Sequence, residues 1–445
     1  MSEVIARHES GVGRRRLALL ALFLLPGLAI SSWVTRTPAI RDAIGASTAE
    51  MGLVLLGLSV GSMVGILAAG PLVTRFGGKP VVVVGMTLLV LSMPTIGLGS
   101  ALGEQSVITA GLALFGAGMG SGEVAMNVEG AAIEELTGRS FLPVMHGCFS
   151  LGTVIGALLG MLATWGGFPV GVHLVLVGAV ALVVALASMS LVPGGTGRVD
   201  PATRALTAAG PRVRVWKDSR LLLIGLVVLA MALAEGTAND WLPLIMVDGH
   251  GVDLALGSAV YAVFAASMMV GRFAGGAIVE RIGRPVVLAG SAMSGVVGLG
   301  LVAFVDSQLV AGLAVVLWGL GTSLGFPLAL SAAGDSGPEP ASRVALVSTV
   351  GYLAFLVGPP VLGFLGEEVG LRNALIVPMV VLVGAAFLTP ATARRGAPDD
   401  DAPTSRTPGA GEGGAPRADG GHGPGTTTSH AGSGESLAPV GARRE

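Results

Sequence analysis

Long apolar runs alternate with short polar segments along most of this sequence. A helix needs about 20 apolar residues to cross a hydrocarbon core of roughly 30 Å. Runs of that length occur twelve times, at residues 16–36, 50–73, 80–101, 106–131, 145–166, 170–192, 220–246, 256–279, 285–306, 309–332, 343–366 and 371–392. The pattern therefore predicts an all-α membrane protein with twelve transmembrane helices, six on each side of a polar linker at 193–219.

A short turn rich in glycine and basic residues follows the second predicted span and recurs after the eighth. The copies begin at Gly70 and Gly276, and the second copy is one residue shorter. Glycine permits a tight turn, and cations hold such a turn at one face of the bilayer. The repeat indicates two equivalent six-helix halves. We expect the turns to act in gating through Gly70, Arg75, Gly77 and Lys79 in the first copy and Gly276, Glu280, Arg281, Gly283 and Arg284 in the second.

The composition agrees with a membrane-embedded helix bundle. Apolar residues make up 52% of the chain and charged residues 12%, and 71 of the 445 residues are glycine. Such a composition suits helices that pack through small residues. The net charge of -2 gives no reason to expect a nucleic acid partner, and the single cysteine, Cys148, lies in an apolar run. We therefore expect no cofactor and no metal, and a protein that works as a monomer in the lipid bilayer.

The distribution of lysine and arginine predicts the orientation of the chain. If the N-terminus is cytoplasmic, the cytoplasmic segments collect most of these cations up to residue 395, and the outer segments carry only Arg36, Arg41 and Arg372. Cytoplasmic loops of multi-pass proteins show such an excess. We predict a bacterial inner-membrane protein with a cytoplasmic segment at 1–15, halves at 16–192 and 220–392, a cytoplasmic linker at 193–219 and a disordered cytoplasmic tail at 393–445.

The twelve spans, the central linker and the repeated turn together resemble the major facilitator superfamily, over about residues 14–393. The first turn carries Thr74 where that superfamily usually has an acidic residue, whereas the second keeps the acid as Glu280. Residues 122–131 and 138–143 are similar to the YbjJ-type inner membrane transporters, near the fucose:proton symporters. The resemblance implies a major facilitator fold and a secondary transporter that moves a small solute by alternating access.

Ionisable residues within the spans are the candidates for a transport site, because a charge costs about 2.5–3.5 kcal/mol at the centre of a membrane helix. Glu123 and Asn127 lie one turn apart on the fourth span, and Glu235 and Asn239 repeat this spacing on the seventh. We predict proton coupling by the two glutamates and substrate binding by the two asparagines. In the fucose permease an acidic residue on the fourth helix couples protons, and Glu123 is the nearest match. The alternatives are a structural hydrogen bond for Glu123 and a salt bridge or a contact to another helix for Glu235.

Other polar or aromatic residues of the spans have two interpretations each. Trp33 and Trp241, on equivalent helices of the two halves, could stack on a sugar ring, or they could belong to the outer aromatic belt. Arg36 fits the membrane interface better than a site for an anionic substrate. Arg272 could extend to the cytoplasm, or it could bind a partner or the substrate. Asp240 lies nearer the outside and could line the vestibule.

No enzyme signature fits this chain. The alternating glycines at 116–122 lie inside an apolar span, and the Gly78-Lys79 pair precedes Pro80 and lacks the glycine that a phosphate loop needs. We therefore expect transport driven by an ion gradient or by downhill flux of the solute, and we predict proton symport of a sugar-like or other hydroxylated metabolite. The alternatives are proton-coupled efflux of a small amphiphile or metabolite, and a membrane sensor or scaffold that does not transport.

The orientation can be tested by cysteine labelling of intact cells. A single cysteine at position 41 should react with an impermeant maleimide from the periplasm, because the asymmetry of basic residues places this segment outside. Labelling of a cysteine at position 204 under the same conditions would contradict the orientation.

Overall fold

The computed structural model describes residues 2–203 and 215–393, so the centre of the predicted linker and almost all of the predicted tail lie outside the described residues. Within these ranges, twelve helical segments are long and apolar enough to cross a membrane. The twelve predicted spans are therefore confirmed. The fourth span runs further than predicted, because its helix continues to Thr137 and ends at Gly138, whose φ of 64° stops the helix.

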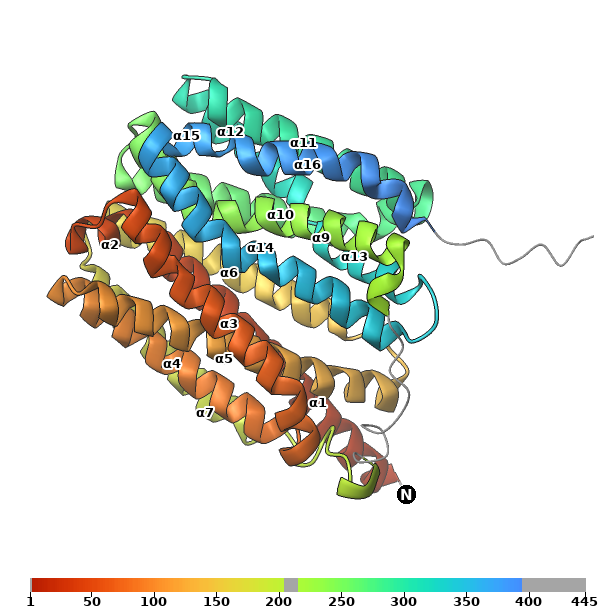
Figure 1. The fold of residues 1–445 in the computed structure, drawn as a ribbon. Coiled ribbons are helices and arrows are strands. Elements are labelled where there is room, and N and C mark those ends of the chain that lie inside the picture. The colour runs from red at the N-terminus through yellow and green to blue at the C-terminus, as the bar shows by residue number, and fades with distance from the viewer. Residues whose placement is uncertain (1, 204–214, 394–445) are drawn as a thin grey trace, which may run out of the picture. The chain divides into compact units, whose positions relative to one another are not determined.

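The first half contains six spanning helices and one short helix (Figure 1). In chain order they are α1 (Ser2–Val34), α2 (Thr37–Ile44), α3 (Thr48–Phe76), α4 (Gly78–Leu102), α5 (Gln105–Thr137), α6 (Leu142–Trp165) and α7 (Val170–Met189). Helix α5 packs against both α3 and α4. A Cβ atom added to Gly61 would lie 2.1 Å from the Ala113 carbonyl oxygen, and one added to Gly85 would lie 2.8 Å from that of Gly118. The small residues therefore let these backbones touch, as the composition indicated.

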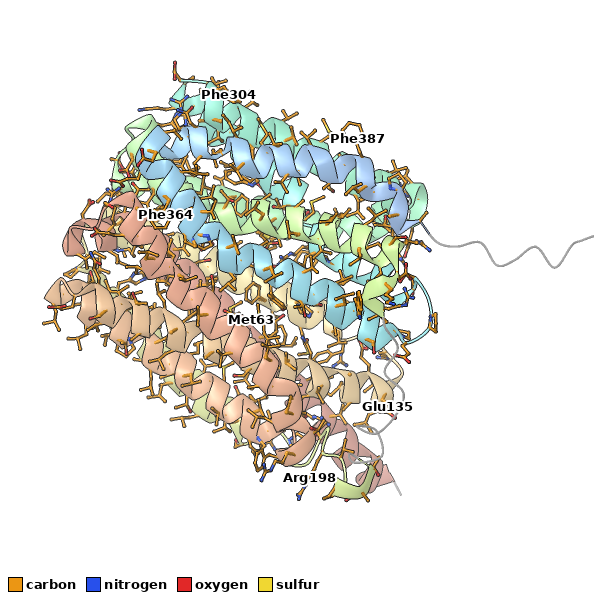
Figure 2. The ribbon with its side chains drawn as sticks, viewed as in Figure 1. Met63, Glu135, Arg198, Phe304, Phe364 and Phe387 are labelled. Carbon is orange, nitrogen blue, oxygen red and sulfur yellow. The ribbon has the colours of Figure 1, made fainter. Side chains whose placement is uncertain are left out.

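The second half repeats this arrangement with more interruptions. It contains η1 (Val215–Lys217), α9 (Ser219–Leu244), η2 (Ile245–Gly249), α10 (Leu254–Ile282), α11 (Arg284–Phe304), α12 (Gln308–Thr322), α13 (Gly325–Gly334), α14 (Pro340–Val369), α15 (Leu371–Ala374), α16 (Ile376–Leu388) and η3 (Thr389–Thr392). Large apolar side chains cover its outside: Phe304 and Phe387 are 57% and 80% exposed and lie at its outer surface (Figure 2). Such a surface suits contact with lipid.

The two repeated turns show why each needs a glycine. Gly77 and Gly283 lie between successive helices with φ angles of 89° and 82°, in a region that only glycine enters readily. The start of the linker packs on the first turn, where the Gly78 N–H donates to the Thr196 carbonyl oxygen at 2.7 Å. Gly70 and Gly276 are different, because a Cβ atom added to either would meet nothing within 4 Å. A close approach of helices at these two positions is absent from this conformation.

The charged residues of the turns also differ in their surroundings. Arg75, Glu280 and Arg281 are exposed, and Lys79 is half-buried. Arg284 forms an ion pair with Asp335 of the second half at 2.5 Å. The arginines Arg75 and Arg281 are both exposed and therefore accessible in this conformation.

The two halves meet along α3 with α14 and along α6 with α10; Figure 1 shows α3 and α14 running side by side. Glycines again allow the closest approach: a Cβ atom added to Gly363 on α14 would lie 2.9 Å from the Cα atom of Gly52 on α3. On the same helix pair, the Ser59 hydroxyl donates to the Phe355 carbonyl oxygen at 2.5 Å. The halves therefore touch through their backbones.

Polar contacts tie the halves together at the end of the bundle that carries α2, which we call the α2 end. Arg41 on α2 forms an ion pair with Asp248 in η2. The Glu367 carboxylate of α14 accepts hydrogen bonds from the Thr48 and Ala49 N–H groups of α3, at 2.9 and 3.3 Å. A carboxylate at this position satisfies free backbone donors and faces the positive end of the helix dipole. The structure is therefore closed between the halves at the α2 end.

This closure can be tested with Glu367→Gln, which keeps the size of the side chain and removes its charge. Losing a carboxylate at a helix N-terminus should raise the population open at the α2 end about two- to fivefold. Distances between spin labels at positions 104 and 306, in a Cys148→Ser background, should then shift to longer values. The neighbouring exposed acid provides the control, and Glu368→Gln should leave the distances unchanged. Equal distance distributions in both variants would show that the Glu367 carboxylate does not hold this end closed.

Candidate functional site

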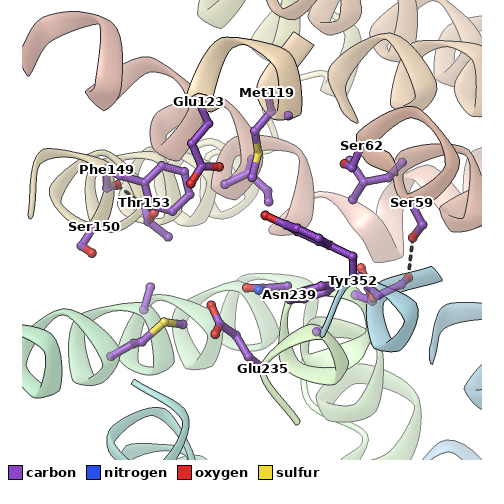
Figure 3. A pocket seen from close by; sticks show the side chains of 18 of the residues that line it. Ser59, Ser62, Met119, Glu123, Phe149, Ser150, Thr153, Glu235, Asn239 and Tyr352 are labelled. Carbon is purple, nitrogen blue, oxygen red and sulfur yellow. Dashed lines mark hydrogen bonds between the residues drawn. The ribbon is translucent and has the colours of Figure 1, made fainter. Parts of the chain in front are cut away.

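A cavity lies between the two halves, lined mainly by α3, α5 and α6 of the first and α9, α10 and α14 of the second (Figure 3). It encloses about 1010 Å³ of empty space, including the part open to solvent. The first half contributes the polar residues Ser59, Ser62, Glu123, Ser150 and Thr153. The second half contributes Glu235, Asn239, Asp240, Tyr261, Arg272 and Tyr352. Apolar walls with a few convergent polar groups are typical of a site for a small molecule.

A charged cluster crosses this cavity. Arg272 on α10 lies 3.1 Å from the Glu235 carboxylate of α9 and donates to the Ser150 hydroxyl of α6 at 3.2 Å. Glu123 of α5 is close enough to interact electrostatically with both Arg272 and Glu235. Glu123 and Glu235 reach into the cavity from opposite sides (Figure 3). The structure thus brings the two predicted acids together around one guanidinium group, and it shows Arg272 binding a partner.

The cavity is also lined by a second set of polar residues, Asn239 and Asp240 on α9 and Tyr261 on α10. The Tyr261 hydroxyl of α10 donates to the side-chain oxygen of Asn239 at 3.0 Å. Asp240, the next residue, also lines the cavity, although the sequence indicated a place in the outer vestibule. The cavity extends around α9 far enough to include both residues, which are about 100° apart on the helix.

Three of the predicted substrate-binding residues do not line the cavity in this conformation. Asn127 lies one turn beyond Glu123 on α5, and its side-chain oxygen is buried without a hydrogen-bond partner among the described residues. Trp33 and Trp241 are each 1% exposed and belong to the apolar core. Core packing of the two indoles also excludes the lipid-facing aromatic belt. Both rings therefore lie in the interior of the bundle and do not line the cavity in this conformation, and the buried N–H group of each has no hydrogen-bond partner among the described residues.

The surroundings of Arg36 also differ from the prediction. Its side chain is 4% exposed, and it donates to the Thr164 hydroxyl at 2.9 Å and to the Phe168 carbonyl oxygen. Arg36 therefore lies at the end of the first span, as expected, but it is buried within the protein there. Arg36 instead connects the end of α1 to the segment that follows α6, where backbone and hydroxyl oxygens compensate for its burial.

The aromatic lining of the cavity was not predicted from the sequence. The chain has two tyrosines, Tyr261 and Tyr352, and both line the cavity. Phe149 and Phe355 line it from α6 and α14. The tyrosines carried a usable signal, because a hydroxyl group buried in an apolar span needs a polar partner. The phenylalanines carried none, because the same residue type also covers the lipid-facing surface.

Comparisons with known proteins agree with this architecture. The chain matches the family model of the Major Facilitator Superfamily over residues 17–344. It is 30% identical over 381 residues to an uncharacterised MFS-type transporter of Yersinia pestis, covering 85% of this chain and 96% of that protein. It is 26% identical over 380 residues to the membrane protein MosC of Rhizobium meliloti, covering 85% and 90%.

Solved transporters share the fold at low sequence identity. The crystal structure of a D-xylose-proton symporter superposes with a TM-score of 0.71 at 12% identity, covering 85% of this chain and 97% of that one. The nucleoside transporter NupG, in a point-mutant form, superposes with a TM-score of 0.68 at 14% identity, covering 85% and 99%. Together with the twelve spans and the cavity between two halves, these matches show that the chain belongs to the major facilitator superfamily and is a multi-pass membrane transporter of small solutes.

Proposed function

We propose that this transporter carries out proton-coupled symport of a small hydroxylated solute, in a bacterial inner membrane and with both termini in the cytoplasm. One observation carries the proposal: a carboxyl group from each half, Glu123 and Glu235, lines the cavity between the halves together with Arg272, which forms an ion pair with Glu235. Transport proceeds by alternating exposure of this cavity to the two sides of the membrane, as a monomer.

The charges of the cluster explain why a proton would accompany the solute. Arg272 compensates for one carboxylate, so any further ionised carboxylate in the same cavity, Glu123 or Asp240, would remain uncompensated. An uncompensated charge far from bulk water is costly, and taking up one proton removes it. Glu123 has no ion-pair partner within 4.0 Å among the described residues, whereas Glu235 has Arg272. We assign the transported proton to Glu123 and not to Asp240 because Glu123 interacts electrostatically with both Arg272 and Glu235, and we regard Glu235 as its partner in coupling.

The same cluster links protonation to the contact between the halves. Arg272 belongs to the second half, and its hydrogen bond to Ser150 reaches the first. A change in the charge around Arg272 therefore acts on a contact that must break when the halves rock apart. A transporter of this kind needs such a link, because a ligand shifts a conformational equilibrium only through unequal affinity for the two states.

The polar groups of the cavity favour a hydroxylated solute. Hydroxyl, amide and carboxylate side chains lie beside aromatic rings, an arrangement that suits the polar edge and the apolar face of a sugar-like molecule. Two transporters with the same fold are named for D-xylose and for nucleosides. A second candidate is proton-coupled efflux of a small amphiphile, which Met119, Met268 and Met269 in the cavity wall favour because methionine adapts to varied apolar shapes.

We also propose that the two repeated turns control closure at their own end of the bundle. In this conformation, which is closed at the α2 end, Arg75 and Arg281 are exposed. When the α2 end opens, the turns approach the other half, and the two arginines gain partners there.

This role of the turns can be tested by replacing Arg75 or Arg281 with Ala. Each variant should favour the conformation closed at the α2 end. The substitution removes contacts that the arginine makes only when the α2 end is open, so it destabilises only that open conformation. Cavity access can be measured by maleimide labelling of a cysteine at position 62 in a Cys148→Ser background. Unchanged labelling in both variants would show that the turns serve membrane orientation alone.

The coupling mechanism can be tested with Glu123→Gln, reconstituted in liposomes with a solute first identified by thermal stabilisation. The amide mimics the protonated carboxyl group and cannot release a proton. The variant should therefore lose accumulation driven by a pH gradient, so that the internal concentration only reaches the external one. Exchange of labelled for unlabelled solute needs no proton release and should continue.

Two further variants complete this test. Glu135→Gln alters an exposed acid on the same helix and should transport as the wild type does. Glu235→Gln should show the same exchange-only behaviour if Glu235 is a partner in coupling, and weaker binding if it contacts the solute. Accumulation by Glu123→Gln at the wild-type level would exclude Glu123 as the proton site. If the protein were a sensor or scaffold, replacing Glu123 and Glu235 would not impair its function.

A further inference from the structure

Asp240 is the acid of the cavity that the charged cluster does not use. Its side chain is 6% exposed and lines the cavity between the halves. It makes no hydrogen bond and no ion pair with any of the other residues in 2–203 and 215–393. A buried carboxylate costs free energy unless its oxygens accept hydrogen bonds. The donors that would satisfy Asp240 must therefore come from what enters the cavity.

The helix leaves the Asp240 carboxylate open to the cavity. Gly236 precedes it by one turn on α9 and lines the cavity too. A Cβ atom added to Gly236 would lie 4.0 Å from an Asp240 carboxylate oxygen and 2.9 Å from the Phe355 ring. A larger residue at position 236 would fill the space beside the carboxylate. The glycine instead leaves room there, next to an aromatic ring that can cover an apolar face.

Asn239 places hydrogen-bond donors next to this acceptor. Its side-chain oxygen already accepts from the Tyr261 hydroxyl, which fixes the orientation of the amide. The NH₂ group of Asn239 therefore offers its two donors. The Asp240 carboxyl group has no cation partner in the described part of the chain and can take up a proton as well, and in either protonation state it keeps an oxygen that accepts hydrogen bonds. Two successive residues of α9 thus present an acceptor and a donor to the same cavity.

We infer that Asp240 and Asn239 form the binding subsite for two neighbouring hydroxyl groups of the solute. One hydroxyl donates to the Asp240 carboxylate, and the adjacent hydroxyl accepts from the Asn239 amide, while the apolar face of the solute packs near Phe355. This assignment rests on the proposed function for its substrate class and specifies it as compounds with vicinal hydroxyls. It also separates binding on α9 from coupling at Glu123 and Arg272.

Binding can be measured with the purified full chain by thermal unfolding and calorimetry. The probes are D-xylose, D-ribose, D-glucose and uridine, which have vicinal hydroxyls, and cyclohexanol and 2′,3′-dideoxyuridine, which lack them. At least one vicinal diol should stabilise the wild type, and its analogue should not. A hydrogen bond to a neutral carboxyl group affects affinity less than one to a charged carboxylate, so Asp240→Asn should weaken binding between about 2-fold and 100-fold, depending on the protonation state.

Controls separate this subsite from general effects on folding. Asp306→Asn replaces an acid that is 93% exposed on the same half and should bind the probe as the wild type does. Asp240→Glu keeps the charge and should retain part of the affinity, even if Asp240→Asn is poorly folded.

Three outcomes would overturn the inference: no stabilisation of the wild type by any vicinal diol, full affinity in Asp240→Asn, or equal stabilisation by cyclohexylamine, which would make Asp240 a site for cations. The proposed function fails separately. Diol binding that depends on Asp240, together with unimpaired accumulation by Glu123→Gln, would retain the subsite and reject the coupling. Proton-coupled transport of a solute without hydroxyl groups would retain the coupling and reject the subsite.

Discussion

The contacts of Arg272 with Glu235 of its own half and Ser150 of the other are the interactions on which the rest of this structure depends. A guanidinium group in the middle of a membrane bundle is stable only with carboxylate and hydroxyl partners around it. Glu235 and Ser150 supply these partners from two different halves. Arg272 therefore contacts both halves beside the cavity. A change in the charge of its partners acts on this contact between the halves.

The glycine-rich packing of the helices makes this polar centre possible. Helices in lipid gain little from burying apolar side chains, so close backbone contact must supply much of their cohesion. The contacts of Gly61 with Ala113 and of Gly52 with Gly363 provide it within and between the halves. Because the closest packing occurs at these small residues, the cavity elsewhere between the halves can remain open without loss of the fold.

The sequence predicted the fold better than it predicted the site, for physical reasons. A membrane-spanning helix is recognised from the average hydrophobicity of about 20 residues, so a single unusual residue does not change the prediction. The acids Glu123 and Glu235 were found because a charge in an apolar run has few explanations. Trp33 and Trp241 were not placed correctly by the same reasoning, because an indole is stable in a core, at an interface or in a site, and only the rotation of its helix decides.

The closure at the α2 end has a consequence for the surroundings in which the protein works. The pair of Arg41 with Asp248 and the contact of Glu367 with the start of α3 lie at the edge of the bundle, within reach of dissolved ions. Screening by salt weakens such contacts over a Debye length of about 8 Å at physiological ionic strength. The ionic strength on that side of the membrane should therefore shift the balance between the two conformations, because these contacts are present in only one of them.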